Sequence, residues 1–111
     1  MKDEPMVTTR IDCFRPDGER HEVVVEIGRP YQAPEGEWAC PVKIRGLYDG
    51  LLDIHGEDSL QALCLAASLV RSLLSSFVEG GGKIMFPNTD YPYDLNATFG
   101  QVGSASSDHG A

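Results

Sequence analysis

The chain has 111 residues, of which 41% are hydrophobic and 23% charged, a composition typical of one folded domain and not of a disordered chain. Its 17 acidic and nine basic residues give a net charge of −8, which argues against non-specific binding to nucleic acid or to an anionic membrane. No uninterrupted apolar run reaches the length of a membrane span, and the first residues lack the apolar core of a signal peptide. We therefore expect a cytoplasmic protein that binds neither membrane nor nucleic acid.

Two strands joined by a tight turn are predicted at the start of the chain. Apolar and polar residues alternate over residues 7–14 and again over residues 20–27, which is the pattern of strands with one buried face. The sequence RPDGE between them combines the proline, aspartate and glycine of a tight turn. We expect an antiparallel hairpin.

A loop and two further strands are predicted next. Residues 28–37 hold two prolines and two glycines, so we expect no regular structure there. Alternation resumes over residues 38–47, where Pro41 cannot donate to a ladder and places that strand at an edge or a bulge. After the Asp49-Gly50 turn signal, residues 51–54 are expected to form a short fourth strand.

The longest periodic segment, residues 58–78, predicts an amphipathic helix. Asp58 is suited to accept hydrogen bonds from the first turn, with Gln61 reaching back toward it, and the glycines from Gly80 onward end the helix. The opposite face is rich in serine and carries Leu65. The side expected to be buried is apolar and takes in Leu60, Ala62, Leu63, Ala66, Ala67, Leu69, Val70, Leu73, Leu74, Phe77 and Val78.

These elements predict an α+β fold in which an antiparallel β-meander of about four strands is covered on one face by a single long C-terminal helix. Residues 83–86 are suited to a short fifth strand after that helix. We expect a single domain over residues 1–99, and a disordered tail over residues 100–111, which lacks the apolar residues needed to order it.

The densest polar cluster of the sequence precedes the helix. Asp49, Asp53, His55, Glu57 and Asp58 could together hold a cation or supply an acid and a base, and a metal site would use the first four. Their spacing matches neither an EF-hand loop nor a zinc motif. Carboxylates before a helix are also favoured by its dipole, so capping and solubility are the favoured explanation of the cluster and a metal site is the weaker alternative. We expect no cofactor.

Cysteine chemistry is the second candidate. The three cysteines, Cys13, Cys40 and Cys64, are widely spaced and form no C-x-x-C pair, which is typical of reduced, buried thiols. His21 lies on the apolar face of its strand, where Cys13 could be its cross-strand neighbour. One Cys and one His make a nucleophilic pair only if they are in contact in an accessible site.

Aromatic residues in loops and at strand ends are the third candidate. Tyr31, Trp38, Tyr48, Tyr91 and Tyr93 could serve contact surfaces or close the ends of the fold. Residues 87–93 combine Pro and Tyr in what we interpret as an exposed, extended recognition segment whose removal leaves the fold nearly intact. The binding residues predicted from these features are Tyr91, Tyr93, Asp90, Trp38 and Leu65.

The stretch W-x-C-P-V-x-I-x-G-L beginning at Trp38, followed by I-x-G-x-D-S-L-Q-A-L beginning at Ile54, resembles the signature of a family of small bacterial proteins of unknown function. The resemblance covers about a third of the chain. It implies a bacterial, intracellular protein of one domain, and it carries no catalytic residues to transfer.

We therefore predict a non-enzymatic protein-binding module. Its partner would be another protein or a second copy of the chain. One specific form is an immunity- or antitoxin-like protein whose acidic charge masks a basic partner. The alternative is a small-ligand- or metal-binding protein, or an enzyme, that uses the acidic cluster from Asp49 to Asp58.

Overall fold

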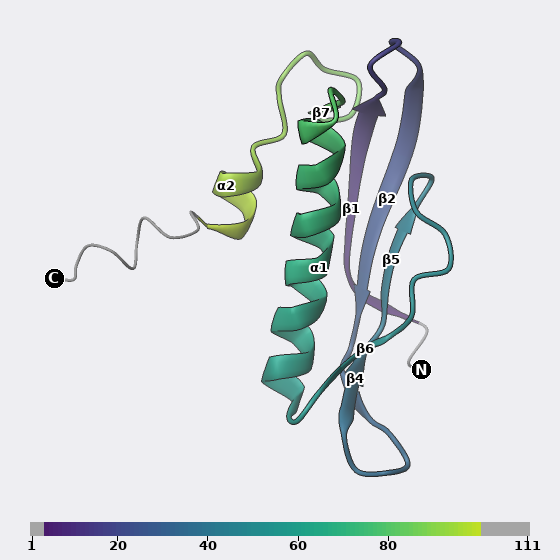
Figure 1. Cartoon of the computed structure of the whole chain (residues 1–111), viewed down its shortest axis with the longest axis vertical. Coiled ribbons are helices and arrows are strands. Elements are labelled where there is room, and N and C mark those ends of the chain that lie inside the picture. Colours follow the sequence, from purple (N-terminus) through teal and green to yellow (C-terminus); the bar gives the residue numbers. More distant parts are fainter. Residues whose placement is uncertain (1–3, 101–111) are drawn as a thin grey trace, which may run out of the picture.

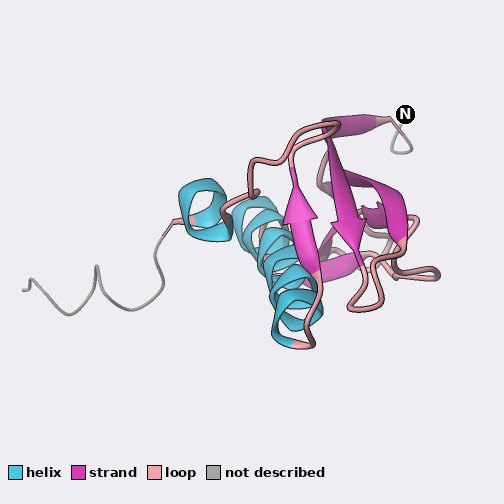
Figure 2. Cartoon of the chain, turned by 90° about the horizontal axis from the view of Figure 1, so that it is seen from above, coloured by secondary structure: helices cyan, strands magenta, loops and turns pink. Residues whose placement is uncertain are grey.

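The computed structural model describes residues 4–100 as an α+β fold in two layers (Figure 1). One long helix, α1 (Ser59–Glu79), lies against antiparallel strands. A second, short helix, α2 (Leu95–Phe99), lies beside α1 on the side away from the strands (Figure 2). The predicted fold class is confirmed in this coarse form.

The predicted hairpin is confirmed as β1 (Pro5–Phe14) and β2 (Arg20–Gly28). The turn is closed by two short hydrogen bonds, from Arg15 N to Glu19 O at 2.8 Å and from Gly18 N to Arg15 O at 2.7 Å. Gly18 takes φ +94° there, a conformation that favours glycine.

The predicted third strand is divided in two at Pro41. Its first part is β4 (Trp38–Cys40) and its second part is β5 (Val42–Arg45). β5 belongs to a four-stranded sheet of order β5-β2-β1-β7, whereas β4 belongs to a three-stranded sheet of order β3-β4-β6. The expected single four-stranded meander is therefore wrong, because proline lacks the N–H that would continue one ladder. The Pro41 carbonyl accepts from Gly28 N at 2.9 Å and links the two sheets.

The three-stranded sheet corrects two other predictions. The expected loop over residues 28–37 contains a short strand, β3 (Tyr31–Gln32), which pairs with β4. The fourth strand is not residues 51–54 but β6 (Ile54–Gly56), also paired with β4. Leu52, which was assigned to that strand, is 81% exposed. The prediction based on this short apolar run therefore started the strand three residues too early.

The helix begins as predicted. Asp58 is the N-cap, with its Oδ1 accepting from Gln61 N at 2.7 Å, and the Gln61 side chain accepts in turn from Glu57 N at 2.6 Å. Gly80 caps the other end. The helix is not C-terminal, however. The possible fifth strand after it is confirmed as β7 (Lys83–Met85), which pairs with β1, and α2 follows β7.

The core lies between α1 and the inner face of the sheets. The strands contribute buried residues such as Ile11, Val23 and Ile44. The buried stripe of α1 is narrower than predicted, because Leu60 is 68% exposed and Val78 is 44% exposed. Its fully buried members, spaced four residues apart, are Ala62, Ala66, Val70 and Leu74.

The segment that follows β7 folds back on the body of the protein. Phe86 N donates to Tyr91 O at 2.9 Å, and Tyr93 N donates to Ile84 O at 2.8 Å, so these residues form a return along β7. The first residue of the predicted tail, Gly100, accepts a hydrogen bond from the Arg71 guanidinium. The rest of that tail lies outside the described residues.

Candidate functional site

The acidic segment before α1 does not form one cluster. The Asp53 carboxylate accepts a 2.5 Å hydrogen bond from the Tyr31 hydroxyl, while His55 Nδ1 lies 2.6 Å from Glu37 Oε2. Glu57 contributes its backbone to the helix cap, and Asp58 is the N-cap itself. The contacts made by this segment are therefore separate from one another.

No three His, Cys, Asp or Glu side chains within residues 4–100 are placed to hold a metal ion together. The predicted metal ligands lie in different segments: Asp49 and Asp53 in the loop between β5 and β6, His55 in β6, and Glu57 between β6 and α1. A metal site needs several donors converging on one point. The observed arrangement instead supplies two separate polar contacts and a helix cap.

The Tyr31–Asp53 contact perturbs the ionisation of the tyrosine. The hydrogen bond to Asp53 raises the pKa of Tyr31, and desolvation adds to the effect. Burial raises the pKa of the nearby Cys40 thiol, again with a contribution from Asp53. The adjoining pocket of about 70 Å³ is lined in part by Glu26, Lys43 and Asp53. Drug-sized ligands occupy pockets of roughly 300–1,000 Å³, so this one fits water or a small ion.

Cys13 and His21 are neighbours, as predicted, but they do not form an open site. The two residues are direct cross-strand partners in the β1–β2 pair. Cys13 is fully buried, and its burial, with the nearby Asp12 charge, raises the pKa of the thiol to about 11. His21 Nε2 accepts from Arg15 Nε at 3.0 Å. A protonated, inaccessible thiol is a poor nucleophile.

The predicted recognition segment is only partly exposed. Tyr91 is 72% exposed and Asp90 is exposed. Tyr93 is half-buried against the core and makes an edge-to-face contact with Phe86, with ring centroids 4.9 Å apart. Asn88 N donates to the buried Asp12 carboxylate at 3.0 Å. The segment is therefore a folded return and not a free extended peptide.

The two remaining predicted contact residues lie on different surfaces. Trp38 is half-buried and packs against the core from β4. Leu65 is 45% exposed on α1. It belongs to a continuous uncharged surface, which we call the neutral helix face, formed by the exposed residues Gln61, Cys64, Leu65, Ser68, Ser72 and Ser76.

The outer face of the four-stranded sheet was not anticipated as a unit. Each strand was read correctly as having a polar side, but the sequence does not say which strands are neighbours. The register brings Arg10 and Arg45 to either side of Val24, and Phe14 between Arg20 and Lys83. The signal that could have revealed this face was the repeated placement of cations at outward positions of successive strands.

By length and composition alone, α1 could also cross a membrane. The core helix of a soluble protein passes the same test, so the result carries little weight. The packing of its buried stripe against the sheets already explains much of its apolar character.

The fold and its surfaces define a small two-layer α+β domain with exposed surfaces of contrasting character: the neutral helix face and a charged sheet face. The family described as "Domain of unknown function (DUF6968)" matches residues 9–96, and the chain belongs to it. No curated protein and no solved structure matches the chain.

Proposed function

We propose that this protein is a non-enzymatic protein-binding module that associates with a second copy of itself through the neutral helix face. The observation that carries the proposal is the limited burial of α1. Four of its 21 residues are buried, and Leu60, Leu65 and Val78 are each more than two-fifths exposed. Of these three, Leu65 lies on the neutral helix face, whereas Leu60 and Val78 lie about 140° around the helix from it. The proposal therefore rests on an exposed Leu65 within an uncharged surface.

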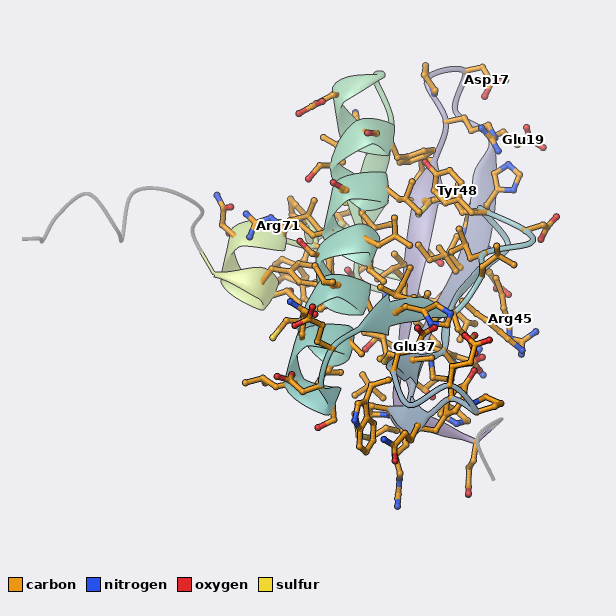
Figure 3. The ribbon with its side chains drawn as sticks, turned by 60° about the horizontal axis from the view of Figure 1, so that its bottom comes forward. Asp17, Glu19, Glu37, Arg45, Tyr48 and Arg71 are labelled. Carbon is orange, nitrogen blue, oxygen red and sulfur yellow. The ribbon has the colours of Figure 1, made fainter. Side chains whose placement is uncertain are left out.

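Charge favours a second copy on this face over other faces of the molecule. Two copies with a net charge of −8 repel one another. The helix interior has one charged side chain, Arg71, and its guanidinium is engaged by Asn96 and Gly100 beside α2 (Figure 3). The six residues of the neutral helix face are uncharged, and Glu79, the last residue of α1, lies beyond Ser76 at the end of this face.

Small side chains on the same face permit close approach of two helices. Ser68, Ser72 and Ser76 are exposed and recur every four residues, so they form one ridge of the helix surface. Two such ridges interdigitate at a crossing angle of about −50°. Leu65 lies beside this ridge and would be covered by the partner.

Sedimentation velocity over a range of protein concentrations tests the proposal. We expect the wild type to form a dimer and Leu65→Glu to remain monomeric, because the substitution places two carboxylates in the contact. Leu52→Glu is the matched control: Leu52 is 81% exposed and lies outside the helix, so the dimer should persist. A wild type that is monomeric at every concentration, or two variants that dissociate alike, would contradict the proposal.

A further inference from the structure

The outer face of the four-stranded sheet gathers the cations of an acidic protein. It carries five of the chain's nine Lys and Arg residues but three of its 17 Asp and Glu residues. Directly paired residues on neighbouring antiparallel strands point to the same face. The five cations of this face, which we call the cationic sheet face, are Arg10, Arg20, Lys43, Arg45 and Lys83.

The three carboxylates on this face are all paired with two of its arginines, and the five cations leave the face with a net charge of +2. Arg20 contacts Asp12 at 3.1 Å and Glu22 at 3.3 Å. Arg45 Nε lies 2.9 Å from Glu26 Oε1, and Figure 3 shows Arg45 pointing away from the body of the protein. The face therefore has internal ion pairs and an excess of positive charge.

The excess charge belongs to three exposed side chains. Arg10, Lys43 and Lys83 have no ion pair with any residue between 4 and 100. They come from β1, β5 and β7, so they are spread across the width of the sheet. The buried residues Ile11, Val25 and Ile44 are on the opposite face, against which α1 packs.

One end of the face is hollowed. A cleft of about 280 Å³ lies between the β1–β2 turn and the residues after β7. Its lining includes the apolar side chains of Phe14 and Met85 together with the cations Arg15 and Lys83. Asp90 lies at the same cleft. An acidic side chain could reach these cations while its aliphatic stem contacts the apolar floor.

We propose that the cationic sheet face is a docking surface for an acidic segment of another protein. The unpaired cations supply attraction, and the existing Arg–carboxylate pairs, with the −8 charge of the whole molecule, oppose the dense charge of a nucleic acid. This surface is separate from the neutral helix face. The inference does not depend on self-association.

Fluorescence anisotropy with a labelled oligoglutamate peptide tests the proposal on the full chain. We expect binding that weakens with salt. Arg10→Glu and Lys83→Glu should each lower the affinity about tenfold, because reversal removes an attraction and adds a repulsion. Arg10 faces Val24 and Lys83 faces Phe14 across their strand pairs, so neither new carboxylate has an acidic direct partner on the neighbouring strand. Asp90 lines the same cleft as Lys83.

Arg29→Glu is the matched control, since Arg29 is exposed between β2 and β3 and changes the net charge equally. It should lower the affinity less than either test variant. Equal losses in all three variants would show that net charge alone governs binding and would overturn the proposal. So would tighter binding of a single-stranded oligonucleotide of equal charge, or no binding of the peptide. Self-association of the variants is followed separately by sedimentation.

Discussion

Gly56 lies where β6 passes the first turns of α1, and the helix backbone leaves no room there for a side chain. A Cβ on Gly56 would come within 2.6 Å of Ala62 N and 3.0 Å of Ala62 Cα. Both are backbone atoms on the buried side of the helix, so neither can rotate away. We predict that Gly56→Ala forces β6 and α1 apart.

The expected cost follows from overpacking at a rigid contact. Such insertions destabilise by about 1–3 kcal/mol, and each kcal/mol lowers the melting temperature of a domain this size by roughly 4–8 °C. The melting temperature should thus fall by about 5–20 °C. Gly80→Ala is the control: Gly80 has φ −81° and its nearest neighbour would be Ser76 O at 3.4 Å. That change should be neutral or stabilise by up to about 1 kcal/mol.

Urea denaturation followed by far-UV circular dichroism measures both variants. The single tryptophan, Trp38, is the direct cross-strand partner of Gly56, so its fluorescence reports locally on the same contact. If Gly56→Ala and Gly80→Ala unfold at the same urea concentration, the close approach of β6 to α1 is refuted.

Four further predictions concern Asp12, the attachment of α2 and the cysteines. Asp12→Asn should cost about 1.5–3 kcal/mol, since the 4% exposed carboxylate loses charge-assisted hydrogen bonds; an unchanged urea midpoint would refute this. Arg71→Met should speed amide exchange over residues 95–100, because two hydrogen bonds and a ring contact are lost; unchanged exchange would argue against it. Iodoacetamide should modify exposed Cys64 in the folded protein and reach Cys13 and Cys40 only after unfolding. Because the folded-state pKa of Cys13 is about 11 against 9.0 for the free thiol, the unfolded chain loses its proton first, so the stability that Cys13 contributes is complete below about pH 9 and is lost as the pH rises toward 11. A Cys13→Ala variant should lack this loss in urea titrations between these pH values.

Local signals in the sequence were sufficient to place the hairpin and the helix. The turn residues before Glu19 and the cap at Asp58 act over a few residues, and the structure has both where they were expected. Pro41 was also recognised as a break in a ladder. The proline alone did not indicate that the chain passes from one sheet to another at this point. That change depends on which strands pair with the residues before and after Pro41.

Periodicity identified which helix residues are apolar, but it did not measure how much of the helix is covered. The wheel placed Leu60 and Val78 on the buried half, and both are largely exposed. Coverage depends on the width of the layer facing the helix, which is a tertiary property. The return of the chain after β7 was missed for a similar reason: Tyr93 is ordered by Phe86 and Ile84, and residues 87–93 carry no periodic signal of their own.

The two proposed surfaces show why net charge is an incomplete guide to a partner. The value of −8 describes the whole chain, whereas a docking partner experiences charges within a Debye length, about 8–10 Å at physiological salt. A partner bound at the sheet face therefore interacts more strongly with Arg10 and Lys83 than with distant carboxylates such as Glu37. The basic partner expected from the sequence stays a prediction for the acidic parts of the surface. On the outer face of the four-stranded sheet, strand pairing brings cations together and makes the local charge positive. The partner that we propose for this face is therefore acidic.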